Sequence, residues 1–364
     1  MSLLLVRKNE IIIHTSSPTF VGFFVYGMMC RFTTMKYKYR EVYGVKNIFF
    51  GLLILFVNIS FGQIISKENL EFDKIYSQVN NKNKWGANDK LGTINYITNE
   101  KILSALKIPN KGVSVSLAFN MVDDSTRINS SSYDHISNFS YEPISIEHNG
   151  YNWIVDNYEI AYHGFTHSHI DGINHLSKDG EMYNGFTDPS ILGVDNYKNG
   201  IISKGILIDV PLLHSKEYVE AGYKVTLKDI LDFEKKYNVK IEKGDVLLIR
   251  TGRWIEKKIK GDWNFPNKGA GIHYNIIPLL SEREIAVLGS DGTNDSNPPL
   301  IKEEGSPIHM LTLVAMGMPL LDNLNLDELS KKAQELNKWE FFISLQPLRF
   351  EGGTGSPLNA LAIF

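Results

Sequence analysis

The chain has 364 residues, of which 43% are hydrophobic and 22% are charged, and its formal net charge is −3. These values are ordinary for a globular protein with a large core, and the length alone allows one to three domains. The charge balance lacks the basic footprint of nucleic-acid-binding proteins, so we expect no nucleic-acid partner.

The N-terminal segment has the pattern of a secretory signal peptide. Basic residues between positions 36 and 46 precede an apolar run at 48–57, and small and polar residues follow at 60–63. The run is shorter than the roughly 20 residues of a membrane-spanning helix, which favours a signal peptide over a membrane anchor. We expect residues 1–62 to be an N-terminal extension and signal peptide, with Met35 as an alternative start to Met1.

Cleavage near residue 62 has two consequences for the mature protein. It would be exported to the periplasm or beyond, without stable membrane insertion. It would also lose Cys30, the single cysteine, and with it any thiol nucleophile, thiolate ligand or disulfide. Because no repeat or low-complexity linker interrupts the remainder, we expect residues 63–364 to form one domain.

Local patterns predict the elements that precede the histidine-rich stretch. In chain order they are a helix or ordered arm at 64–83, a turn-rich segment at 85–95, a short helix at 100–106, a half-buried strand at 113–119, a long irregular loop at 123–150 and a strand at 153–162. Long loops in compact domains are often lids or binding loops. His135 and His148, which lie in this loop, are interpreted as surface residues.

The second half of the chain alternates strands and helices, as an α/β protein does. In chain order the patterns predict strands at 205–210, 244–252 and 285–291, an apolar helix at 308–316, a short strand or turn at 319–324, an amphipathic helix at 326–336 and a final strand at 339–348. Thr226 and Asp229 have the spacing of a helix N-cap with an acid three residues on. His214 and His273 are interpreted as surface residues.

Residues 162–175 hold four of the ten histidines together with an aspartate. If the strand at 153–162 continues, alternate side chains from position 163 to position 171 share one face. His169 and Asp171 then lie about 7 Å apart along the strand, which suits two ligands of one ion. Imidazole and carboxylate together suit zinc, manganese or iron. The alternative is a chance grouping of surface histidines.

Two common enzyme motifs are excluded. The chain has no Gly-x-Ser-x-Gly sequence, so a serine hydrolase elbow is not indicated. The glycine-rich loop at 352–359 lacks the lysine of a phosphate-binding P-loop.

The segment 168–175, Ser-His-Ile-Asp-Gly-Ile-Asn-His, resembles the Thr-His-x-Asp-x-Pro-x-His pattern of the cyclase family of metal-dependent hydrolases. This family includes bacterial kynurenine formamidases and isatin hydrolases, and the chain looks closest to its longer bacterial branch. The resemblance spans about residues 80–364 and also rests on the segments 85–95, 180–185, 244–252, 316–320 and 352–357. It implies a layered β/β/α swivelling-type α/β fold in a single domain, assembled as a homo-oligomer.

The resemblance also implies the ligands of one or two divalent ions per chain, zinc or manganese. His163, His169 and Asp171 are expected to hold the first ion, with His167 as the alternative to His163. Asp171 is expected to bridge to a second ion held by His309 and Asp322. The family has glutamate or glutamine at the position of Asp322, and the shorter aspartate leaves open how a second ion is held. The competing interpretations are a capping or core role for His309 and a turn role for Asp322.

The mechanism implied by the resemblance is attack of a metal-activated water on a small amide, of the aryl formamide or lactam type. His175 would then carry the proton to the leaving nitrogen, unless it is a structural histidine. A lactone or cyclic-ester hydrolase and a small-molecule binding protein without turnover are the two alternatives. The loops at 123–150 and 262–275 are expected to determine which small molecule is bound.

Overall fold

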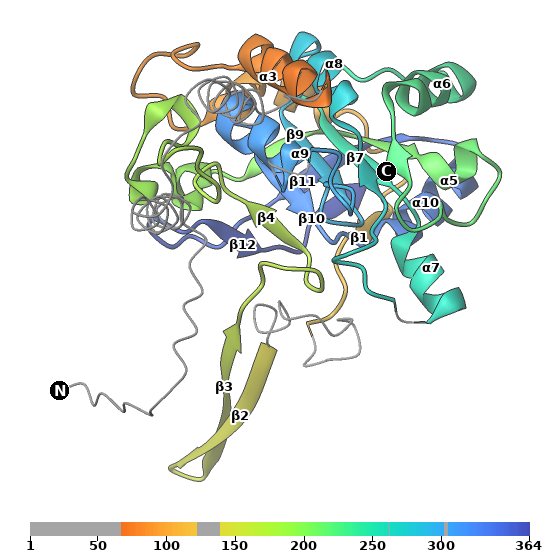
Figure 1. The fold of residues 1–364 in the computed structure, drawn as a ribbon. Helices are drawn as coiled ribbons and strands as arrows, with labels where there is room; N and C mark the ends of the chain where they lie inside the picture. The colour runs from red at the N-terminus through yellow and green to blue at the C-terminus, as the bar shows by residue number, and fades with distance from the viewer. Residues whose placement is uncertain (1–66, 122–138, 262, 302–304) are drawn as a thin grey trace, which may run out of the picture. The chain divides into compact units, whose positions relative to one another are not determined.

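In this computed structural model, the residues described are 67–121, 139–261, 263–301 and 305–364. They lie in one compact unit, residues 65–364 (Figure 1). The predicted signal peptide and His135 lie outside the described residues. Within the described ranges, no helix combines the length and the hydropathy needed to cross a membrane.

A nine-stranded mixed sheet runs through the unit in the order β1-β13-β11-β5-β7-β9-β10-β4-β12. The strands are β1 (Ser114–Ser116), β4 (His169–Asp171), β5 (Ile201–Asp209), β7 (Val246–Arg250), β9 (Val287–Ser290), β10 (Leu320–Asp322), β11 (Glu340–Leu345), β12 (Gly355–Pro357) and β13 (Leu361–Ile363). In this spatial order, adjacent strands in the run β5-β7-β9-β10 are parallel. The other adjacent pairs are antiparallel. The central strands are buried on both faces, which explains their uninterrupted apolar sequences.

Helices pack against the sheet and against one another. The α-helices are α3 (Lys67–Val79), α4 (Asn99–Ala105), α5 (Val210–Leu213), α6 (Leu227–Tyr237), α7 (Arg253–Lys260), α8 (Ile277–Glu282), α9 (Pro307–His309) and α10 (Leu326–Leu336). The π-helix η8 (Met310–Met316) continues α9 and is fully buried. The 3-10 helices are η1 (Gly92–Tyr96), η4 (Tyr183–Gly185), η5 (Pro189–Leu192), η6 (Val194–Tyr197) and η7 (Tyr274–Ile276).

Two small sheets complete the unit. One is the hairpin of β2 (Phe139–His148) and β3 (Tyr151–Ile160), and the other is the parallel pair β6 (Lys224–Val225) and β8 (Gly271–Ile272). Figure 1 shows the hairpin as a ribbon that extends away from the nine-stranded sheet.

The predicted α/β class is confirmed, and several elements match their predicted positions. Helix α10 covers the predicted residues, and α6 begins with the expected capping box between Thr226 and Asp229. The apolar helix at 308–316 ends where Gly317 adopts a left-handed conformation with φ of 67°. Its π-helical part was not predicted, because its apolar sequence carries no separate signal for that geometry.

Three expectations about where strands begin, continue or end were wrong. Residues 139–148, assigned to an irregular loop, form β2, while 122–138 lie outside the described residues. The strand predicted at 153–162 ends at Ile160 and does not continue into the histidine cluster. The strand at 339–348 is not the last, because β12 and β13 follow it, and β12 lies within the glycine-rich loop. Pairing with β4 overrides the loop-like composition of that segment.

Candidate metal centre

Strand β4 presents two polar side chains to one side of the sheet. His169 and Asp171 are two residues apart and share a face, while Ile170 between them points into the core. The neighbouring strand β10 is antiparallel, and Asp322 lies directly opposite His169. Residues opposite each other in an antiparallel pair project to the same face, so Asp322 joins the first two side chains.

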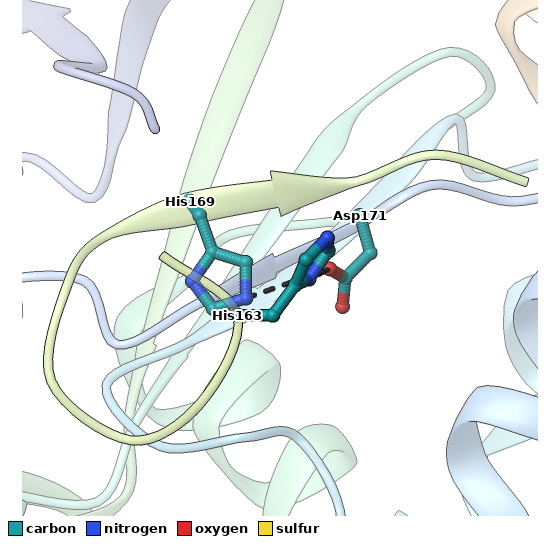
Figure 2. Close-up of side chains that lie close together, drawn as sticks. All are labelled: His163, His169 and Asp171. Atoms are coloured by element: carbon teal, nitrogen blue, oxygen red, sulfur yellow. Dashed lines mark ion pairs between the residues drawn. The ribbon is translucent and has the colours of Figure 1, made fainter. Parts of the chain in front are cut away.

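His163 reaches the same point from the segment between β3 and β4 (Figure 2). Its Nδ1 atom lies 3.0 Å from Asp171 Oδ1, and His169 Nε2 lies 3.4 Å from that same oxygen. The ring of His163 rests against Gly355 of β12, where an added Cβ would come within 2.8 Å of its Cε1 atom. Glycine at 355 therefore makes room for the imidazole.

His309 completes a second group around the other oxygen of Asp171. Its Nε2 atom lies 3.4 Å from Asp171 Oδ2 and 3.9 Å from Asp322 Oδ2. The two groups, His163–His169–Asp171 and Asp171–His309–Asp322, each place their donor atoms within 4.8 Å of one another. Asp171 is common to both and is 1% exposed.

Hydrogen bonds fix the orientation of two of the imidazole rings. His169 Nδ1 donates to the carbonyl oxygen of His167 at 2.7 Å, and His309 Nδ1 donates to Asp295 Oδ2 at 2.6 Å. Asp295 is itself held by the backbone N–H groups of Ile308 and His309. Each ring therefore directs Nε2 towards Asp171. Ring nitrogens that bind metals are oriented in this way by partners on the opposite nitrogen.

The titration behaviour of these groups shows how strongly they interact. Burial disfavours a charged His169, yet the charge of Asp171 raises the pKa of His169 to about 9. The pKa of His309 is also raised well above its usual range, against the effect of burial, by Asp171 and Asp295. Burial and the nearby Asp171 carboxylate raise the pKa of Asp322 to about 7. These raised pKa values mean that the cluster binds protons around Asp171. A metal cation could take the place of those protons.

The donor atoms fit a divalent metal ion. Ligands about 2.0–2.1 Å from a tetrahedral ion lie roughly 3.3 Å from one another, and the observed separations around Asp171 are 3.0, 3.4 and 3.4 Å. Asp171 Oδ1 is buried and faces two imidazole nitrogens, His163 Nδ1 and His169 Nε2, in ion-pair rather than hydrogen-bond geometry. A buried carboxylate oxygen in that state is stabilised by a cation. The mixture of imidazole and carboxylate suits zinc or manganese.

His175 lies beside the cluster and belongs to neither group of donor atoms. Its ring stacks on His163, with centroids 4.1 Å apart and planes 9° apart, and its centroid is 6.4 Å from that of His309. The residue as a whole is exposed, but dense packing around the ring lowers its pKa to about 4, with Asp171 opposing the shift. At pH 7 the imidazole of His175 is therefore neutral, with one ring nitrogen in the acceptor state.

His167 also lies in neither group. It is buried, its ring centroid is 6.5 Å from that of Phe139, and its carbonyl oxygen orients His169. Between the two candidates for the remaining ligand, the geometry brings His163, and not His167, to Asp171.

A buried arginine supports the segment that carries His163. Arg253, at the start of α7, donates to the carbonyl oxygen of Phe165 at 2.5 Å and to Asn323 Oδ1 at 2.6 Å. Asn323 in turn donates to the carbonyl oxygen of Gly164 at 2.7 Å. The guanidinium stacks on Phe265, 3.6 Å from the ring centroid. Burial lowers the pKa of Arg253 to about 9, so the side chain is charged at neutral pH.

Several supporting residues were not predicted from the sequence. They are Asn294, which donates to Asp322, Asp295, which holds His309, Thr354, whose Oγ1 lies 3.2 Å from His163 Nε2, and Arg253. The polar residues after the strand at 285–291 gave a partial signal, because strand ends often border sites. Asn294 and Asp295 follow it within five residues.

A family model described as a putative cyclase matches residues 95–294 of the chain. A search of curated proteins found no match. The matched span includes β4 and most of the sheet. It ends at residue 294, so Asp295, His309 and Asp322 lie beyond it.

Solved structures share the fold. A crystal structure described as a novel cyclase is 25% identical, with a TM-score of 0.69, and the match covers 79% of this chain and 99% of that one. An isatin hydrolase from Labrenzia aggregata, bound to benzyl benzoate, is 22% identical with a TM-score of 0.52. That match covers 69% of this chain and 93% of the hydrolase. An isatin hydrolase from Ralstonia solanacearum is 22% identical with a TM-score of 0.51. That match covers 71% of this chain and 93% of the hydrolase.

Proposed function

Because this chain belongs to the cyclase family, we propose that it is a metal-dependent hydrolase that cleaves a carbon–nitrogen bond in a small amide. The substrate class is an aryl formamide or a lactam. The observation that carries the proposal is the pair of donor groups that share the buried Asp171. Isatin hydrolases with the same fold support the class of reaction by analogy.

We assign the ligands as follows. His163, His169 and Asp171 would hold the first ion, and Asp171, His309 and Asp322 would hold a second. A zinc or manganese ion here would polarise the substrate carbonyl and lower the pKa of a water molecule, which are the two contributions hydrolysis needs. Asp295 and the carbonyl oxygen of His167 would keep two of the ligand rings in place.

His175 is the proposed proton carrier. It is neutral near pH 7 and lies against His163, so its ring is close to the reacting centre without occupying a ligand position. It would accept the proton of the attacking water and deliver it to the nitrogen that leaves. A carbon–nitrogen bond needs this delivery, because an amide nitrogen is a poor leaving group until it is protonated.

The test combines metal analysis with a substrate panel. Purified protein, stripped of metal and then supplied with zinc or manganese, is expected to hydrolyse N-formyl arylamines or lactams. His175→Ala should keep its metal and lose most of the turnover. His214→Ala is the matched control, because His214 pairs with Asp229 away from the site.

Other results would redirect the assignment. No bound metal and no metal-dependent hydrolysis would refute the proposal. Turnover of lactones alone would point to cyclic-ester hydrolysis, and metal binding without turnover on any member of the panel would favour a binding protein.

We also propose that the protein is exported. The pattern at 36–63 supports cleavage near residue 62. N-terminal sequencing of the protein recovered from the periplasm or medium should begin near residue 63. An intact N-terminus on protein in the cytosolic fraction would contradict export.

A further inference from the structure

The ring of His163 faces Asp171 through a different nitrogen from the other two histidines. Its Nδ1 atom lies 3.0 Å from the carboxylate (Figure 2). His169 and His309 instead direct Nε2 to that carboxylate, at 3.4 Å each. A neutral imidazole that binds an ion through Nδ1 must carry its proton on Nε2. Whatever keeps the proton on Nε2 therefore prepares His163 to be a ligand.

A chain of hydrogen bonds begins at His163 Nε2 and leads away from the metal centre. Thr354 Oγ1 lies 3.2 Å from this nitrogen, and the Thr354 hydroxyl is also hydrogen-bonded to the hydroxyl of Tyr162. Tyr162 in turn donates to the carbonyl oxygen of Gly355 at 2.7 Å. The chain thus runs from a ring nitrogen through two hydroxyl groups to a backbone carbonyl.

The carbonyl at its end gives the chain one direction. A carbonyl oxygen accepts and cannot donate, so the single proton of the Tyr162 hydroxyl is committed to Gly355. The Tyr162 oxygen then accepts from Thr354, which uses the only proton of the Thr354 hydroxyl. Thr354 Oγ1 can therefore only accept from His163, and this requires a proton on Nε2.

The backbone places both hydroxyl groups next to the metal centre. Thr354 directly precedes β12, the strand that pairs with β4. Its carbonyl oxygen accepts the N–H of Gly172, the residue after Asp171, at 2.8 Å. The ring centroid of Tyr162 lies 4.5 Å from that of His163. The hydroxyl groups are thus held by the same strand pairing that holds the shared carboxylate.

We propose that Tyr162 and Thr354 are positioning residues that set the tautomer of His163, so that this histidine binds the first ion through Nδ1. The opposite tautomer would put a proton on Nδ1, where it would compete with the ion. Neither residue belongs to the two groups of donor atoms. The inference rests on the proposed ligand role of His163, and it does not depend on which bond the enzyme hydrolyses.

NMR of the full chain, loaded with zinc and carrying isotope-labelled histidine, tests the tautomer without any substitution. Long-range correlations between ring protons and ring nitrogens distinguish a nitrogen bound to zinc from one bound to hydrogen. His163 should bind zinc through Nδ1 and carry a proton on Nε2, whereas His169 and His309 should bind through Nε2. Zinc on Nε2 of His163 would overturn the proposal.

Substitutions along the chain of hydrogen bonds test its two hydroxyl groups. Thr354→Val removes one hydroxyl at nearly constant size and should lower zinc affinity about 10–100-fold, the usual effect of losing a residue that orients a ligand. Thr354→Ser should restore the affinity. Tyr162→Phe should give a mixture of His163 tautomers in the same spectra, because the proton of Thr354 is then free to turn to Nε2.

Thr226→Val is the matched control. Its hydroxyl donates to Asp229 at the start of α6, away from the metal centre. The control should keep wild-type zinc affinity. Wild-type affinity and an unchanged spectrum in Thr354→Val would overturn the positioning role.

The results also separate this inference from the proposed hydrolysis. Zinc bound through His163 Nδ1, in a protein that hydrolyses no member of the substrate panel, would support the tautomer and refute the activity. Metal-dependent hydrolysis with His163 bound through Nε2 would support the activity and refute the tautomer. A protein that binds no zinc would overturn both.

Discussion

Replacing Arg253 by lysine should weaken metal binding without unfolding the protein. The guanidinium donates to two acceptors at once, the Phe165 carbonyl and Asn323 Oδ1. A lysine ammonium on a flexible stem cannot reproduce this fork. The Phe165 carbonyl lies two residues from His163, so loss of the hydrogen bond frees the segment that carries this ligand.

The expected losses of stability and of metal affinity follow from the hydrogen bonds that the substitution removes. One hydrogen bond from a charged donor contributes about 1.5–3 kcal/mol, which is the expected loss in the free energy of unfolding. Substitution of residues that orient metal ligands typically lowers metal affinity by about 10–100-fold, and we expect a loss in that range for Arg253→Lys. Calorimetric titration of the metal-free protein measures the affinity, and urea unfolding measures the stability.

Arg250→Lys is the matched control. Arg250 is as buried as Arg253, at 4% exposed for each, but it binds Asp209 and Asp327, away from the metal centre. It should lose similar stability and keep wild-type metal affinity. Equal losses of affinity in both variants would mean that general destabilisation is responsible. Unchanged affinity in Arg253→Lys would refute the positioning role.

Three further predictions concern the proposed metal ligands and the glycine that makes room for one of them. Asp171→Asn should abolish binding at both groups, whereas Asp322→Asn should leave one ion per chain; elemental analysis after dialysis counts the ions. His163→Ala should weaken binding far more than His167→Ala in the same titration, and the reverse order would exchange their roles. Gly355→Ala should lower metal affinity, because its methyl group would press on the His163 ring and on a backbone carbonyl; unchanged affinity would show that the ring has room to move.

Local sequence patterns predicted the buried elements well. Strands β7 and β9 lie within the apolar runs expected for strands covered on both faces, and β5 overlaps its predicted run but begins four residues earlier, at Ile201. The shared face of His169 and Asp171 follows from the two-residue period of any strand. His309 and Asp322 were expected from family resemblance, and the register of β10 against β4 explains how Asp322 reaches the cluster.

The local sequence patterns did not predict the long-range contacts that support the site. Arg253 supports a segment 88 residues earlier in the chain, and Asp295 orients a histidine 14 residues later. No period or spacing encodes such pairs, because they depend on how strands are ordered in the sheet. The expected continuation of a strand through the histidines failed for a related reason. β3 pairs with β2 in a separate hairpin, and the chain must leave that ribbon before it joins the main sheet as β4.

The most direct test of the account is anomalous scattering from crystals grown with zinc or manganese. A peak enclosed by His163, His169 and Asp171 is the predicted result, with a second peak between Asp171, His309 and Asp322 at sufficient metal concentration. Crystals of metal-loaded protein with no peak beside Asp171 would contradict the central claim that this carboxylate organises a metal centre.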